Sequence, residues 1–460
     1  MKTKITFLIA FLFVCFNTSF AQQDEECVTK LSIFHEYAKA KNYDAAYEPW
    51  MAVRNKCPKY SIAIYSDGEK ILKHKIKNTT GEDKIASIND LILLLDQRAE
   101  NFPSNTKKGD NASKACQLMF DNKDLLGKTT AELYECFDTA YNADKKTFTN
   151  PKSLYTYFSL MVDLYDAGAK PAKDLFNKYD DIVEKVEDEV KSYSESLNKL
   201  VEKEDAGTVL TKREGSYKKY YESYLKNYDL ISGNIDAKLG KRANCENLIP
   251  LYEKDFEAHR TDAVWLKRAV SKMYHKECTE DALYEKLVKA YDETAPSADT
   301  KYFVATILLK NGKTSEAESY LNQSFELETD PYKKGKLANR IGLILKKKGK
   351  RSKARTFFRQ ALKLNPSNGR PHLSIASMYA SSAKNCGDTN FNKRAVYWLA
   401  AQEAQKASRV DPTLKKSASQ SATSYNAKAP TKSEIFTAGM SGKTISIGCW
   451  IGASVKVPSI

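Results

Sequence analysis

Residues 336–366 read KLANRIGLILKKKGKRSKARTFFRQALKLNP, and this stretch decides the fold. A small residue is followed twelve positions later by alanine, then by an aromatic residue, a second alanine and a closing proline. These positions are Gly342, Ala354, Phe358, Ala361 and Pro366, with Gly349 between the two halves. Small residues let paired helices approach closely, and proline ends a helix. The stretch therefore predicts two antiparallel helices joined by a turn at Gly349.

The same spacing recurs on both sides of this unit. The preceding unit has Ala305, Gly312, Ala317, Leu321 and Ser324 and ends near Pro331. The following unit has Ala376, Tyr379, Ala400, Ala407 and Pro412, with an insertion over residues 385–392. Near the N-terminus the pattern returns as Tyr37, Asn42-Tyr43-Asp44, Ala46, Trp50 and Pro58. In these units the chain resembles the tetratricopeptide-repeat (TPR) family. The resemblance implies an all-α, α–α superhelix whose surfaces bind protein or peptide partners.

Two long helical segments follow the N-terminal repeats. Apolar residues are spaced alternately three and four apart from Phe176 to Leu200, and again from Tyr217 to Ile235. Such heptads, separated by a break at Ala206-Gly207, predict a long antiparallel coiled-coil-like hairpin that protrudes from the solenoid. It is interpreted as a brace or as an arm for a partner. Acidic residues such as Asp180-Asp181 and those at 187–189 are expected on its solvated outer face.

The last fifty residues change in character. Residues 414–427 predict a capping helix, and beyond Ile435 apolar residues alternate with a period of two through Ile445, Ile447 and Val455. This pattern predicts a small β-containing tail, either a cap or an edge for a partner strand. The expected organisation is a signal peptide (1–21), N-terminal TPR-like repeats (22–170), the long hairpin (171–240), C-terminal TPR repeats (241–412), and a capping helix with the β tail (413–460).

The N-terminus has the features of a secretory signal. A basic start (Met1 to Lys4) precedes an apolar run (Ile5 to Phe16), and Ser19 and Ala21 suit cleavage before Gln22. No later run is long enough to predict a transmembrane segment in the mature chain. The composition, rich in Lys, Asn and Tyr, resembles envelope proteins of the Bacteroidota. We therefore expect an exported protein that is periplasmic or associated with the outer membrane.

Eight cysteines remain after loss of Cys15, an even number that suits disulfides in an oxidising compartment. In an antiparallel helix pair, residues at equal distance from the turn face each other. Three pairs straddle predicted turns, at Asn42, beside Gly127 and at Arg260-Thr261-Asp262. This symmetry predicts the disulfides Cys27–Cys57, Cys116–Cys136 and Cys245–Cys278, and by elimination Cys386–Cys449.

Catalytic and cofactor motifs are not supported by the sequence. A zinc site at Cys245, His259, His275 and Cys278 fails, because the hairpin separates His259 from the cysteines by more than about 20 Å. Residues 439–444 (GMSGKT) lack the first glycine of a phosphate-binding loop and lead into a strand pattern. Five scattered histidines give no nucleophile–base motif. We expect no metal, no cofactor and no enzymatic activity.

The net charge of +15 makes anionic partners the natural candidates, and export argues against nucleic acid. Basic residues crowd one repeat, and this cluster is interpreted either as a solubilising surface or as a patch for an anionic partner. The candidate patch is Lys333, Lys334, Lys336, Arg340, Lys346, Lys347, Lys350 and Arg351. Lys336, Asn339 and Arg340 resemble the carboxylate clamp of some TPR domains, but Thr306 and Ser374 depart from it.

The sequence thus predicts a non-catalytic, protein-binding scaffold of the cell envelope. Two alternatives stay open: a component of an outer-membrane secretion or assembly complex, and a protein that binds or processes envelope polysaccharide or peptidoglycan. The identity of the partner does not follow from the residues.

Overall fold

The computed structural model describes residues 25–460, so the predicted signal peptide lies outside the described residues. Within this range the chain is helical apart from one small sheet. The described chain divides into two compact units, one that ends at Tyr179 and one over Asp180–Ile460, and the boundary falls inside the long helix α9 (Ala172–Asp205). None of the helices in residues 25–460 combines the length and apolar character needed to cross a membrane.

The first unit is a series of short helices that pack in sequence order. A helix over residues 25–39 is followed by α2 (Tyr43–Lys56), α3 (Ala63–Asn78), α4 (Gly81–Asn101), α5 (Lys108–Asp121), α6 (Lys123–Leu126), α7 (Thr130–Ala143) and α8 (Pro151–Asp166). The predicted turn between two helices at Gly127 is present, with Gly127 at φ 61° in the left-handed region that favours glycine. The sequence did not predict the one-turn helix α6 that precedes it.

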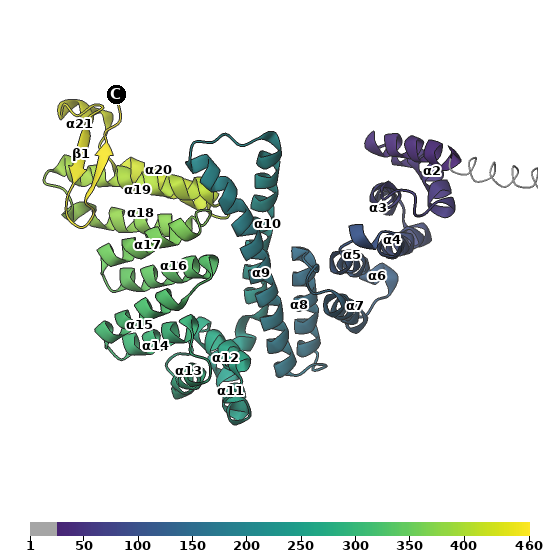
Figure 1. The fold of residues 1–460 in the computed structure, drawn as a ribbon, viewed down its shortest axis with the longest axis horizontal. Helices are drawn as coiled ribbons and strands as arrows, with labels where there is room; N and C mark the ends of the chain where they lie inside the picture. Colours follow the sequence, from purple (N-terminus) through teal and green to yellow (C-terminus); the bar gives the residue numbers. More distant parts are fainter. Residues whose placement is uncertain (1–24) are drawn as a thin grey trace, which may run out of the picture. The chain divides into compact units, whose positions relative to one another are not determined.

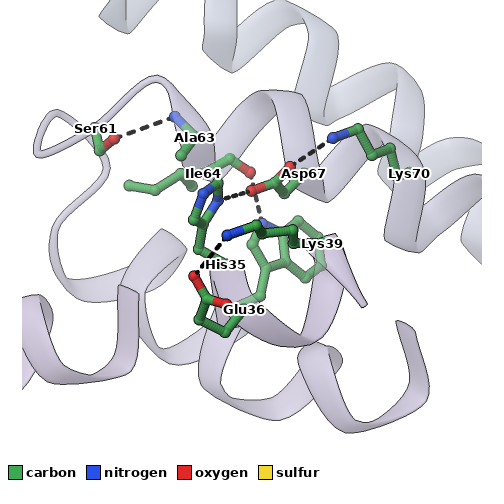
Figure 2. Close-up of polar contacts among 9 residues, drawn as sticks. His35, Glu36, Lys39, Ser61, Ala63, Ile64, Asp67 and Lys70 are labelled. Atoms are coloured by element: carbon green, nitrogen blue, oxygen red, sulfur yellow. Dashed lines mark hydrogen bonds and ion pairs between the residues drawn. The ribbon is translucent and has the colours of Figure 1, made fainter. Parts of the chain in front are cut away.

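The core of the N-terminal repeat is built around Trp50. The Trp50 side chain is fully buried, and its indole N–H donates to the Ile64 carbonyl oxygen at 2.7 Å. Gly68 allows this packing, because a Cβ atom there would lie 2.6 Å from the indole ring. Beside it, the buried carboxylate of Asp67 bonds the His35 ring at 2.7 Å and accepts from Lys70 at 2.8 Å (Figure 2). These bonds join the helix over residues 25–39 to α3.

The second unit holds the regular repeats. Its helices after α9 are α10 (Lys212–Leu239), α11 (Cys245–His259), α12 (Ala263–His275), α13 (Ala282–Thr294), α14 (Ala298–Lys310), α15 (Thr314–Leu327), α16 (Pro331–Lys347), α17 (Arg351–Leu364), α18 (Arg370–Ser382), α19 (Asn390–Val410), α20 (Lys415–Lys428) and α21 (Lys432–Thr437). Helices α14 to α19 lie side by side as antiparallel pairs (Figure 1). The all-α repeat architecture is thus confirmed.

The C-terminal tail forms the predicted small sheet. Strands β1 (Thr444–Ile447) and β2 (Ala453–Lys456) pair antiparallel, with Ile445 opposite Val455. The alternating apolar side chains predicted from the sequence are buried on one face, so the period-two pattern was read correctly. The turn of this hairpin is bonded to α18, because the indole N–H of Trp450 donates to the Ser382 hydroxyl at 3.0 Å.

The long helices α9 and α10 run across the ends of the C-terminal repeats (Figure 1). From residue 180 onward, α9 makes ion pairs or hydrogen bonds with α12, with α16, with the loop before α18 and with α19. Leu197 and Val201 of α9, Leu225 of α10 and Val410 of α19 form one apolar cluster. The expectation of a protruding hairpin is therefore wrong, and within this unit the two helices brace the repeats.

The expectation that the acidic residues of α9 face solvent holds for Glu187 and Asp188, which are exposed, and is wrong for Asp180, which packs against the repeats. The Asp180 carboxylate pairs with Lys272 of α12 at 2.8 Å, and the side chains are 13% and 2% exposed. Asp181 pairs with Arg268 at 2.9 Å, and Glu187 pairs with Lys336 of α16 at 3.0 Å. Burial raises the pKa of Asp180 and lowers that of Lys272, and each charge opposes this effect on the other. Asp180, Asp181 and Glu187 thus contact the repeats, although Glu187 remains exposed to solvent.

The bracing contact can be tested at Asn198. The backbone N–H of Ser367 donates to the side-chain oxygen of Asn198 at 2.9 Å, and both residues are buried. Replacing Asn198 with alanine is expected to lower the free energy of unfolding by about 1–3 kcal/mol, because a buried N–H loses its acceptor. Urea unfolding followed by circular dichroism measures this. The exposed neighbour Lys199→Ala is the control, and equal stability of the two variants would count against the brace.

Four disulfides join the cysteine pairs predicted from the sequence, three from the turn symmetry and Cys386–Cys449 by elimination. Cα atoms are 6.5 Å apart in Cys27–Cys57, 5.8 Å in Cys116–Cys136, 5.4 Å in Cys245–Cys278 and 5.5 Å in Cys386–Cys449. The first three each join the two helices of one antiparallel pair, near the open end for Cys27–Cys57 and Cys245–Cys278 and at mid-helix for Cys116–Cys136. The fourth ties the β tail to the segment between α18 and α19, so it closes the longest loop, with a separation of 63 residues.

Candidate functional site

The predicted basic patch does not form one surface. Six of its residues lie on α16, and Lys350 and Arg351 lie at the start of α17. Lys334 packs 4.7 Å above the Phe325 ring of α15, and Lys346 donates to Ser377 of α18 at 3.1 Å. Partial burial lowers the pKa of Lys346. The side chains therefore point in several directions around the helix, and the structure separates them into an inner and an outer group.

The inner group is Lys336 and Arg340, one helical turn apart on α16. Lys336 is paired with Glu187 of α9, and an Arg340 nitrogen lies 3.4 Å from the His275 ring. Burial acts to raise the pKa of Glu187, but Lys336 and Arg340 outweigh it and hold that pKa below its ordinary value. Burial and the Arg340 charge also lower the pKa of His275. The chain's own acidic helix thus occupies this face of α16.

A groove of about 330 Å³, lined by charged, polar and apolar residues, opens beside the inner group, between α9–α10 and the repeats. The charges of its lining are balanced. The acidic residues are Glu187, Asp229 and Asp411, and the basic residues are Lys336, Arg340 and Arg370. Arg370 pairs with Asp229 at 3.2 Å, and Asp411 accepts from the Gly369 N–H at 3.0 Å.

Asn339, the middle residue of the clamp-like trio, also lines this groove. Its side-chain oxygen is buried and has no hydrogen-bond partner among the described residues. Because Lys336 and Arg340 already contact Glu187 and His275, no pair of free cations faces a ligand carboxylate here. In a carboxylate clamp the cations bind the ligand, whereas in this groove Lys336 and Arg340 contact residues of the chain itself.

The outer group lies where α16 ends and α17 begins, and its residues are Lys347, Lys348, Lys350, Arg351 and Lys353. Lys350 and Lys353 both pair with Glu318 of α15, the latter at 2.7 Å. Burial acts to raise the pKa of Glu318, and the two lysines reverse this effect and lower it. Lys347, Lys348 and Arg351 make no ion pair with any residue in the range 25–460. This turn therefore carries three cationic groups without an ion pair, and Lys333 and Lys334 at the start of α16 also make none within residues 25–460.

Two histidine–carboxylate pairs were not found by sequence reasoning. His35 bonds Asp67, and His372 bonds Glu403 at 2.6 Å, across separations of 32 and 31 residues. Each separation is close to one repeat length, which is the signal that could have found them. Close to the first pair, the Ser61 hydroxyl oxygen accepts from the Ala63 N–H at 3.2 Å (Figure 2). Both pairs join neighbouring helices.

Groups of metal-binding side chains were also considered. Within residues 25–460, no three histidine, cysteine, aspartate or glutamate side chains are placed together to hold a metal ion. Cys245 and Cys278, two members of the zinc site considered from the sequence, are joined to each other by a disulfide.

Comparison with known proteins identifies the repeat. The tetratricopeptide-repeat family model matches residues 335–368, which contain Gly342, Phe358 and Pro366. The prediction that this stretch is a tetratricopeptide repeat is therefore confirmed. The chain is a helical-repeat protein that contains this repeat. No curated protein matches the chain.

Several solved structures are similar to the chain at low identity. A tetratricopeptide repeat protein from Parabacteroides merdae is 11% identical, with a TM-score of 0.25, over 68% of this chain and 97% of its own. Human IFIT1, solved as a dimer with PPP-AAAA, is 12% identical, with a TM-score of 0.29, over 88% of this chain and 94% of its own. Yeast Tom70 is 12% identical, with a TM-score of 0.25, over 90% and 83% of the two chains.

Proposed function

We propose that this protein is an exported, non-catalytic scaffold of the bacterial cell envelope that binds an anionic protein or peptide partner through its helical repeats. The observation that carries the proposal is the tetratricopeptide repeat at residues 335–368, since stacked helix pairs of this kind present extended surfaces to other proteins. In the same repeat, Lys347, Lys348 and Arg351 supply unpaired positive charge. An acidic partner surface would complement them.

Export is supported by the cysteines and by the N-terminal residues. Four disulfides in residues 25–460 suit an oxidising compartment and are rare in the cytosol. The basic and apolar segments before Ala21 fit a cleaved secretory signal. We infer a periplasmic or outer-membrane-associated location.

Crosslinking mass spectrometry in the native envelope tests the proposal. Amine-reactive crosslinks from lysines of the repeats, Lys347 and Lys348 among them, should reach one or a few envelope proteins reproducibly. Crosslinks to an outer-membrane machine would favour a role in secretion or assembly. The proposal would be contradicted by a chain that stays in the cytoplasm with reduced cysteines. It would also be contradicted by one that gives no intermolecular protein crosslink and is retained on peptidoglycan.

A further inference from the structure

A second concavity lies next to the outer basic group, on the side of the repeats formed by α15 and α17. It measures about 220 Å³ and has its floor on α16. We refer to it as the α15–α17 slot. Its lining residues are Glu318, Leu321, Asn322, Ile341, Leu345, Lys353, Thr356 and Phe357.

The floor of the slot is apolar and well formed. Leu321, Ile341 and Leu345 are at most 3% exposed, so they belong to the core of the repeat and hold the base rigid. Phe357 forms a half-buried wall and is supported edge-on by the Phe325 ring, with centroids 5.5 Å apart. A preformed apolar cavity of about 150 Å³ is enough to hold a benzene ring. The slot therefore has room for one leucine or aromatic side chain.

The rim of the slot is cationic. Lys353 stands on it, and Lys350 and Lys353 together neutralise Glu318, the one acidic residue of the lining. Helix α17 carries five basic residues and no acidic one. Of these, Arg351, Arg359 and Lys363 make no ion pair within residues 25–460. These three cations lie on α17 outside the lining of the slot, so a ligand that combines an apolar anchor for the slot with carboxylates along α17 would suit this surface.

We propose that the α15–α17 slot is the docking site for an acidic peptide segment, which inserts one leucine or aromatic side chain between α15 and α17 and places carboxylates along α17. The inference rests on the proposed scaffold function and names its surface and the chemistry of its partner. The inner face of α16 is not used in this proposal, because its Lys336 already pairs with Glu187 of α9.

Selection of peptides from a random 12-residue display library on the full disulfide-bonded chain tests the slot. Enriched peptides should share an excess of Asp and Glu around one large apolar residue. Thr356→Trp fills the slot from an exposed position, and it is expected to weaken a synthesised consensus peptide by about tenfold to a hundredfold. The matched control is Ser352→Trp, one turn earlier on α17 and outside the lining, which should bind like the wild type. Circular dichroism checks that both variants fold.

The charge requirement is tested separately with the same consensus peptide. Arg351→Glu removes a cation that has no internal partner, and it should weaken binding by about fivefold or more at low salt, with a smaller loss at high salt. Lys416→Glu on exposed α20 is the control with the same change in charge.

Three outcomes of the peptide selection and binding measurements overturn the slot. They are a selection that enriches no peptide, one that enriches neutral or basic peptides, and binding that Thr356→Trp and Ser352→Trp change equally. Failure of the scaffold function is distinguishable. Envelope crosslinks that avoid Lys353 and Lys363 of α17 would remove the slot and leave the scaffold function standing, whereas absence of protein crosslinks would contradict both.

Discussion

Replacing Phe358 with alanine is expected to lower the free energy of unfolding of the C-terminal repeats by about 3–5 kcal/mol. The side chain is fully buried and fills the space between the two helices of the tetratricopeptide repeat. Its ring lies directly over Gly342, where an added Cβ atom would sit 2.6 Å from it. Urea unfolding monitored by circular dichroism measures the loss.

The contact between this ring and Gly342 can be isolated with a double-mutant cycle. Gly342→Ala alone should cost about 1–3 kcal/mol, because the new methyl group overpacks the interface. With Phe358→Leu in the background that cost should shrink, since the smaller side chain leaves room, and the two changes should be coupled by about 0.5–3 kcal/mol. Gly233→Ala is the control, because nothing lies within 4 Å of a Cβ there and alanine favours the helix. Additive effects would show that the helices do not meet through this pair.

The repeat could be predicted from the sequence because its determinants are local. Gly342, Phe358 and Pro366 lie at fixed spacings within one helix pair. Gly342 and Phe358 pack the two helices together, and Pro366 ends the second helix. The apolar stripe of α9 was also visible, since helical periodicity marks the buried side of a helix. The two-residue period of the β tail predicted its strands for the same reason.

The role of the acidic stripe on α9 could not be predicted in the same way. Periodicity separates apolar from polar faces, but it does not say which charged face meets a partner. Asp180, Glu184 and Glu187 recur on one side of the helix, and their partners Arg268, Lys272 and Lys336 lie more than eighty residues away. Such pairs depend on how the hairpin folds back against the repeats. The same long-range arrangement decides that Lys336 and Arg340 face inward and that the unpaired cations of the outer group lie at the turn into α17.

Removing the Cys386–Cys449 disulfide is expected to have the second largest effect. The bond closes a loop with a separation of 63 residues, so the chain-entropy account assigns it about 4 kcal/mol, against about 3 kcal/mol for Cys116–Cys136, which spans 20 residues. The Cys386→Ser/Cys449→Ser double variant should therefore unfold at lower urea concentration than Cys116→Ser/Cys136→Ser. Unfolding of both under non-reducing conditions gives the comparison.

The two double variants should also differ in which part of the chain unfolds locally and becomes open to protease. The β tail keeps the Trp450–Ser382 hydrogen bond and the contact of Arg355 with the Ile451 carbonyl oxygen after Cys386–Cys449 is lost. The tail also buries Ile447 and Ile451, but without the disulfide no covalent cross-link holds it, so trypsin should cut the Cys386→Ser/Cys449→Ser variant first within the tail, at Lys432 or Lys443, while the wild type resists. Treatment of the wild type with a reductant should reproduce this cleavage. If the tail stayed protected in both, its packing on α18 and α19 would be sufficient by itself, and the disulfide would not be what holds it.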